Sequence, residues 1–188
     1  VDAAKTGMLP NAAVVEAVAA AVEALEIPLL VVDPVMVAKS GDRLIDDEAL
    51  GALRAELLRH AFVVTPNIPE AEVLAGFPIT TDDDRRRAAE VIHRLGSTAV
   101  IIKGGHFGSG VIRDLLFDHD GFSEFEAERV QSRNTHGTGC TFSAALAAHL
   151  AMGRTLREAV PLVQKYIATA IRKSPSIGHG HGPMQHFV

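Results

Sequence analysis

The chain has 188 residues, of which 47% are hydrophobic and 22% charged, and its 23 acidic and 18 basic side chains give a formal net charge of −5. This composition predicts a single globular domain over residues 1–188 and excludes a disordered chain. The longest apolar runs are far shorter than the ~20 residues that span a bilayer, so no membrane partner is expected. The acidic balance argues against a nucleic-acid partner, because nucleic-acid-binding domains carry a basic face. The composition does not exclude a small anionic ligand.

Cysteine content and the N-terminal residues bear on the compartment. Cys140 is the single cysteine, which excludes an intramolecular disulfide. The N-terminal residues lack the charged start, apolar core and cleavage site of an export signal. These features predict a cytoplasmic protein. Because the sequence does not begin with Met, we also expect it to be the C-terminal portion of a longer chain.

Helices and strands alternate along the first hundred residues. Residues 11–25 carry apolar side chains at helical spacing, and the short apolar run at 29–32 predicts a buried strand. The same reasoning predicts further helices and strands, the helices at 46–59, 68–75 and 82–95 and the strands at 61–65 and 98–103. Strands that alternate with helices indicate an α/β domain with a mostly parallel sheet.

The pattern changes in the second half of the chain. Apolar runs at 111–117 and 122–130, separated by a polar turn, predict an antiparallel hairpin at the edge of the sheet. A glycine turn at 137–139 leads into helices at 138–152 and 156–173. Because ligands of parallel sheets bind beyond the carboxyl ends of the strands, the residues that follow the predicted strands are the candidates for chemistry.

The most informative motif is NTHGTGCT, which runs from Asn134 to Thr141. Gly137 and Gly139, on either side of Thr138, allow a tight turn whose N–H groups can bind one anion at the positive end of the following helix. This predicts a phosphate cradle without a Walker lysine, and the alternative is a flexible helix cap. Cys140 falls in the first helical turn, where thiols ionise readily, although an isolated Cys is more often a small buried hydrophobe.

Three predicted strand ends carry polar side chains. The segment TPNIPE places Asn67 and Glu70 on one face of a first helical turn, where the carboxylate could bind Mg²⁺ or instead form a capping box with Asn67. Asp33 ends a buried strand and is either a loop-entry cap or part of a metal or phosphate site. Lys103 precedes Gly104-Gly105-His106, and its ammonium could reach a transferring phosphoryl group or simply be solvated.

Other segments exclude several classes of protein. The chain contains no P-loop, no GxSxG elbow and no HExxH helix, which removes the commonest NTPase, hydrolase and metalloprotease interpretations. The tail GHGHGP at 178–183, with His186 beyond it, lacks a second rigid pair of ligands. It therefore predicts a closely packed loop near a ligand rather than a structural zinc site.

Taken together, these segments resemble the ribokinase-like superfamily, and specifically the hydroxymethylpyrimidine/phosphomethylpyrimidine kinases of thiamine biosynthesis. The resemblance covers the chain in order through KTGML at 5–9, DPVMV at 33–37, TPNIPEAE at 65–72, KGGH at 103–106, THGTGCT at 135–141 and GHGHGP at 178–183. It implies a three-layer α/β/α fold, a homodimer, and ATP- and Mg²⁺-dependent phosphorylation of the pyrimidine alcohol and of its monophosphate. Family members are longer at the N-terminus, so we expect a first strand and a Gly-rich substrate loop to be missing here.

The resemblance also implies roles for single residues. The backbone of Gly137, Thr138, Gly139 and Cys140 would bind the γ-phosphate, Lys103 would offset the phosphate charge, and Cys140 would act as the base. Thr65 and Asn67 would lie near the nucleotide phosphates. Asp33 and Glu70 would bind Mg²⁺, mostly through water, and Met8 and Val35 would line the pyrimidine pocket beside Cys140. Pyridoxal kinase activity and a non-catalytic pyrimidine-binding module are the alternatives.

Overall fold

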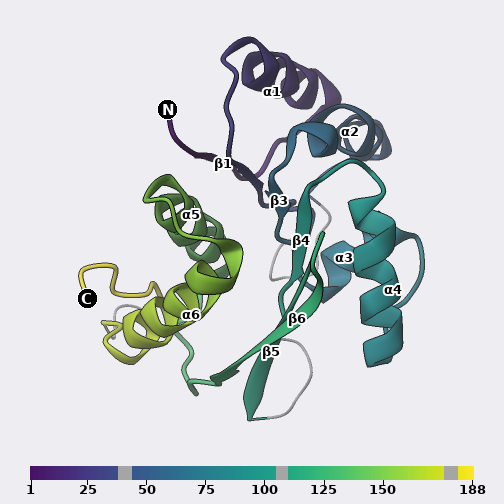
Figure 1. Cartoon of the computed structure of the whole chain (residues 1–188). Helices are drawn as coiled ribbons and strands as arrows, with labels where there is room; N and C mark the ends of the chain where they lie inside the picture. The colour runs from purple at the N-terminus through teal and green to yellow at the C-terminus, as the bar shows by residue number, and fades with distance from the viewer. Residues whose placement is uncertain (38–43, 105–109, 176–181) are drawn as a thin grey trace.

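A computed structural model describes residues 1–37, 44–104, 110–175 and 182–188, and its centre is a six-stranded sheet in the order β1-β2-β3-β4-β5-β6 (Figure 1). The strands are β1 (Ala4–Thr6), β2 (Leu30–Val32), β3 (Val63–Val64), β4 (Ala99–Ile102), β5 (Val111–Asp118) and β6 (Gly121–Glu128). Neighbouring strands from β1 to β4 are parallel, whereas β5 and β6 form an antiparallel hairpin at the edge. The predicted α/β fold with an edge hairpin is confirmed.

Helices cover both faces of this sheet (Figure 1). One face carries α1 (Ala12–Ala24), α2 (Asp47–Ala52), α3 (Ile68–Ala75) and α4 (Asp82–His93), and the other carries α5 (Thr138–Ala151) and α6 (Leu156–Arg172). The helices that connect β1 to β4 all lie on one face, because right-handed crossovers that advance in one direction return on the same side. The result is the three-layer α/β/α arrangement that the family resemblance implied.

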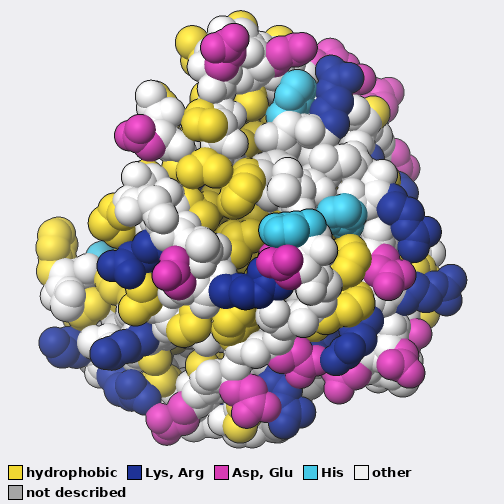
Figure 2. All heavy atoms as spheres, in the orientation of Figure 1, with side chains coloured by type: hydrophobic (Ala, Val, Ile, Leu, Met, Phe, Trp, Pro, Cys, Tyr) yellow, Lys and Arg dark blue, Asp and Glu magenta, His cyan; other side chains and the backbone are white. Residues whose placement is uncertain are grey.

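Strand side chains alternate between two apolar cores. Val32, Val64 and Ile102 pack beneath α1 to α4, whereas Val31 and Val63 pack against α5 and α6. All five are fully buried, which is why these strands read as continuous apolar runs. Figure 2 shows hydrophobic side chains filling the space between α5 and the sheet. The two cores leave the carboxyl edge of the sheet as the place where polar groups gather.

Two elements differ from the prediction. β1 was not predicted, because its three residues Ala-Lys-Thr carry no apolar strand pattern. The helix predicted at 46–59 changes pitch after α2, with a π-helical turn at Leu53–Leu57 (η1) and a 3₁₀ turn at Leu58–His60 (η2). The change of pitch accompanies the burial of Leu53, Leu57 and Leu58 against α1. No helix within the described ranges is long and apolar enough to cross a membrane.

The end of β4 approaches β5 so closely that only glycine fits. A Cβ on Gly104 would lie 1.7 Å from the carbonyl oxygen of Arg113, whereas a Cβ on Gly51 of α2 would meet nothing within 4 Å. We expect Gly104→Ala to lower the free energy of unfolding by about 3 kcal/mol or more, because the backbone must shift.

Gly51→Ala is the matched control and should raise the free energy of unfolding by about 0.5–1 kcal/mol, since alanine favours the helix. Denaturant unfolding of the two variants measures both effects. A Gly104→Ala protein as stable as the wild type would contradict this packing.

Candidate active site

The carboxyl ends of the parallel strands meet at one edge of the sheet. Asp33 follows β2, Thr65 follows β3 and Lys103 follows β4, so the three residues leave the sheet side by side. Lys103 also forms a parallel bridge with Asn67, the residue that caps α3. The structure thereby brings together four of the residues singled out in the sequence.

A buried ion pair lies at the centre of this edge. The Nζ atom of Lys103 is 3.0 Å from Oδ1 of Asp33, and the two side chains are only 14% and 2% exposed. The other oxygen of Asp33, Oδ2, accepts a hydrogen bond of 3.2 Å from the hydroxyl of Ser143 in α5. Shielding from water strengthens such an interaction relative to one on the surface. Asp33 therefore links β2 with β4 and with α5.

The N-terminus of α5 faces the ion pair. Gly137 precedes the helix with a left-handed φ of 81°, and the N–H of Thr141 donates to its carbonyl at 2.9 Å. The N–H groups of Gly139 and Cys140 therefore precede the helical ladder, where they can bind an anion. A Cβ on Gly139 would lie 3.3 Å from the Nζ of Lys103. The glycine keeps the ammonium and the start of the helix in contact.

Cys140 lies in the first turn of α5 and is exposed. The expectation that an isolated cysteine in an Ala-rich helix is a small buried hydrophobe is therefore wrong here. The helix buries Phe142, Ser143 and Leu146 instead, which turns the thiol away from the core. Exposure at a helix N-terminus is the environment in which a thiol can meet a substrate.

Asn67 and Glu70 form a capping box, as one interpretation of the sequence held. The Oδ1 of Asn67 accepts the Glu70 N–H at 2.9 Å, and Oε2 of Glu70 accepts the Asn67 N–H at 2.8 Å. Burial raises the pKa of Glu70 to about 6, and the negative charge of Asp33 acts in the same direction. The charge of Lys103 and the N–H groups of Asn67 and Met36 oppose this rise.

These carboxylates fit a hard cation. Burial is the main cause of the raised pKa of Glu70, and the negative charge of the buried Asp33 adds to it. A divalent cation beside these two carboxylates would offset their negative charge. The hydroxyls of Thr6 and Thr65 are buried nearby at the ends of β1 and β3, and neither has a hydrogen-bond partner among the residues that the structure describes. Since an unpaired buried hydroxyl is unfavourable for folding, a polar ligand at this edge would give both threonine hydroxyls a hydrogen-bond partner.

The remaining predicted residues are less enclosed. Met8 follows β1 and is 53% exposed, while Val35 follows β2 and is partly buried. His106 and residues 178–181 lie outside the described residues. At the end of the tail, a Cβ on Gly182 would lie 2.3 Å from Oδ1 of Asn134, so this part of the tail packs closely beside the segment before α5.

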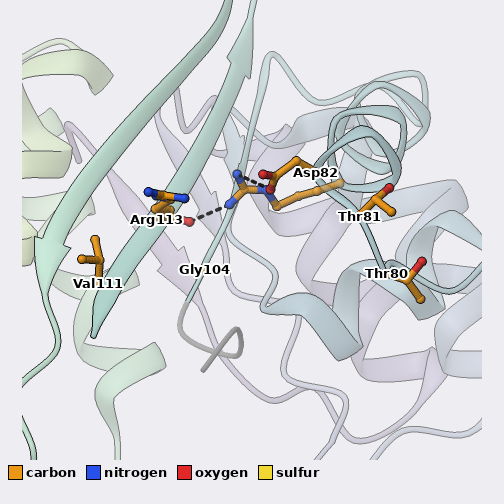
Figure 3. A pocket seen from close by; sticks show the side chains of 7 residues that line it. Thr80, Thr81, Asp82, Gly104, Val111 and Arg113 are labelled. Atoms are coloured by element: carbon orange, nitrogen blue, oxygen red, sulfur yellow. Dashed lines mark hydrogen bonds and ion pairs between the residues drawn. The ribbon is translucent and has the colours of Figure 1, made fainter. Parts of the chain in front are cut away.

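Sequence reasoning missed Ser143, Thr6 and a cavity. Ser143 had one usable signal, its place one helical turn after Gly139. The cavity, of about 260 Å³, lies beside the start of α4 and is shown in Figure 3, lined by Thr80, Thr81, Asp82, Arg85, Gly104, Val111 and Arg113. The cavity adjoins the candidate site at Gly104, which follows Lys103 in the chain.

Comparison with known proteins shows the family. The family model for phosphomethylpyrimidine kinase matches residues 1–185. The thiamine biosynthesis bifunctional protein ThiED of Geobacter sulfurreducens is 48% identical over 188 residues, which cover 100% of this chain and 38% of that protein. The hydroxymethylpyrimidine/phosphomethylpyrimidine kinase of Bacillus subtilis is 43% identical over 188 residues, covering 100% of this chain and 69% of the relative. The chain belongs to the phosphomethylpyrimidine kinase family, which confirms the resemblance.

Solved structures agree with this assignment of the fold. The ADP complex of Bacillus subtilis pyridoxal kinase superposes with a TM-score of 0.90 at 39% identity, covering 99% of this chain and 70% of that one. Phosphomethylpyrimidine kinase from Clostridium difficile superposes with a TM-score of 0.78 at 37% identity, covering 90% and 68%. The chain thus spans 38% of one relative and about 70% of the others.

The raised pKa of Glu70 has a measurable effect on stability. Between pH 6 and the ordinary carboxyl range near 4.5, the folded protein binds a proton at Glu70 before the unfolded chain does, so acidification favours the folded state. Relative to Glu70→Gln, which does not titrate, the wild type should gain about 2 kcal/mol in free energy of unfolding between pH 7.5 and pH 4. Urea unfolding of both proteins across this range measures the difference, and a difference independent of pH would contradict it.

Proposed function

We propose that this chain is a single kinase domain that uses ATP to phosphorylate 4-amino-5-hydroxymethyl-2-methylpyrimidine and then its monophosphate, in thiamine biosynthesis. The observation that carries the proposal is the placement of Lys103 between Asp33 and the N-terminus of α5. A cation and a set of helix N–H groups at one point suit the charge on a transferring phosphoryl group. Membership of the family, and the name of the Bacillus subtilis relative, support the choice of substrate.

The residues divide the chemistry between them. In the first transfer the alcohol oxygen attacks the γ-phosphorus of ATP, the bond to the β–γ bridging oxygen breaks, and ADP leaves. The N–H groups of Gly137 to Cys140 bind the phosphoryl oxygens while Lys103 offsets their charge, and the Cys140 thiolate accepts the hydroxyl proton. In the second transfer the nucleophile is a phosphate oxyanion, which carries no proton to remove.

Cofactor and binding roles complete the proposal. Mg²⁺, which neutralises phosphate charge when bound, would be held by Asp33 and Glu70, mostly through water. In this proposal Thr65 and Asn67 lie near the nucleotide phosphates, and Met8 and Val35 line the pyrimidine pocket. We propose further that the protein is a cytoplasmic homodimer that acts on small molecules and has no nucleic-acid or membrane partner.

Pyridoxal kinase activity is the second candidate, because a specific observation favours it. The structure of the pyridoxal kinase from Staphylococcus aureus in complex with AMP-PCP and pyridoxal superposes with a TM-score of 0.88 at 36% identity, covering 98% of this chain. The folds of the two activities are therefore too similar to distinguish them. A non-catalytic pyrimidine-binding module is the third candidate.

Competition between acceptors tests the substrate. With Mg-ATP and both alcohols present, we expect kcat/KM for the hydroxymethylpyrimidine to exceed that for pyridoxal by about tenfold or more, the scale on which a pocket separates similar ligands. Mass spectrometry of the two phosphorylated products measures the ratio. A preference for pyridoxal would favour the second candidate, and pyrimidine binding in calorimetry without release of ADP would favour the third.

Cys140→Ala tests the base. A general base contributes about 10²-fold or more to a proton transfer, so the variant should lose about that factor in phosphorylation of the alcohol and much less in phosphorylation of the monophosphate. Cys140→Ser, which keeps the size of the side chain but is a poor base, should behave like Cys140→Ala. Equal losses in both steps would contradict the base and leave Cys140 a positioning role.

A further inference from the structure

Lys103 directly follows β4, and Asp114 lies on the neighbouring antiparallel strand β5. The register of β4 and β5 pairs Ile101 with Leu116 and Ile102 with Leu115, and continued by one residue it would bring Lys103 opposite Asp114. Ile101 and Leu116 belong to the core beneath α5 and α6, so Lys103 and Asp114 fall on that same face. Opposite charges in this relation ordinarily attract each other across the ladder.

The two side chains nevertheless have other partners. Lys103 reaches past β3 to Asp33 on the far side. Oδ1 of Asp114 accepts the N–H of Gly104 at 2.8 Å, and its Oδ2 accepts Nε2 of Gln164 in α6 at 2.8 Å. Both carboxylate oxygens are therefore occupied, although Asp114 is only 3% exposed and Gln164 only 9%. Both of these donors are neutral, and a buried carboxylate held by neutral donors rather than by a cation is unfavourable for folding, so this arrangement calls for a reason.

The same carboxylate also ends the pairing of the two strands. Beyond the last printed pair, Ile102 with Leu115, Gly104 lies against the backbone of Arg113, but its N–H donates to Asp114. The carbonyl of Arg113 accepts Nη1 of Arg85 at 2.7 Å instead, as Figure 3 shows. Asp114 and Arg85 thus bind these two backbone groups from opposite faces of the sheet. The chain can leave β5 directly after Lys103.

We propose that Asp114 is a positioning residue that, held by Gln164, fixes the backbone after Lys103 and directs the Lys103 ammonium to Asp33 and the start of α5. The proposal rests on the proposed kinase function, in which Lys103 meets the phosphates. Asp114 acts through Lys103. Gln164 has the complementary role of occupying the oxygen that would otherwise attract the ammonium across the ladder.

Asp114→Ala and Asp118→Ala form a matched pair for the test. Asp118 lies on the same strand face, is 7% exposed, and pairs with Arg157 of α6 at 2.8 Å. Its loss removes a buried carboxylate contact with the same helix at a distance from Lys103. Misplacement of a charged group by about 1 Å can cost up to 10²-fold, so Asp114→Ala should lower kcat with Mg-ATP and the pyrimidine alcohol by about tenfold or more. Asp118→Ala should lower the melting temperature and retain kcat, and equal effects on kcat would overturn the proposal.

A double-mutant cycle separates positioning from general stability. If Asp114 acts through Lys103, Asp114→Ala should cause no further loss of kcat in a Lys103→Ala protein, whereas independent effects would add. Additive losses would overturn the proposal.

If Asp114→Ala does not fold, Gln164→Met takes its place, because it frees Oδ2 of Asp114 to attract Lys103. Its kcat should fall in the wild-type background and not in Lys103→Ala, and an unchanged kcat would overturn the proposal.

A measurement that does not depend on catalysis separates the test of the positioning role from the test of the kinase activity. Hydrogen exchange at the Gly104 amide should accelerate in Asp114→Ala and stay unchanged in Asp118→Ala, whichever substrate the wild type prefers. An inactive wild type would contradict the kinase activity alone. Equal exchange at Gly104 in both variants would overturn the positioning role even in an active enzyme.

Discussion

The ion pair between Lys103 and Asp33 is the interaction on which the geometry of this site depends. It joins the ends of two strands that are separated by β3, and the bond from Ser143 attaches α5 to the same carboxylate. Because Asp33 is 2% exposed, removal of either partner leaves a buried charge uncompensated, which costs far more than loss of a surface pair. One carboxylate thus sets the spacing between sheet edge and helix start.

The polar groups around this pair are individually unfavourable for folding. Glu70 has a raised pKa, the hydroxyls of Thr6 and Thr65 have no hydrogen-bond partner within the described part of the chain, and Asp114 is a buried carboxylate. Such groups gather where a protein performs chemistry, and the remainder of the fold must supply the stability that they reduce. Here two continuous apolar cores, one on each face of the sheet, enclose the strands that carry them.

The sequence predicted the architecture because local patterns determine it. Apolar runs and caps fix the helices and strands, and the strand ends identify Asp33 and Lys103. β1 escaped prediction because its three residues lack such a pattern, and the exposure of Cys140 depends on which face of α5 meets the sheet. Ser143 and Asp33 are 110 residues apart in the chain, and Gln164 and Asp114 are 50 apart. Spacing along the sequence carries no signal for such pairs, so only the fold reveals them.

The sharing of Asp33 has a consequence for the order and strength of binding in the proposed reaction. A nucleotide whose phosphates draw the ammonium of Lys103 away leaves the buried carboxylate of Asp33 without its counter-charge, and a cation then binds there more tightly. Thermodynamic linkage makes this effect reciprocal, so that a cation at Asp33 releases Lys103 and raises the affinity for the nucleotide by the same factor. In the proposed reaction the Lys103–Asp33 ion pair thus couples the two ligands, because the nucleotide takes over the ammonium and the cation takes over the carboxylate.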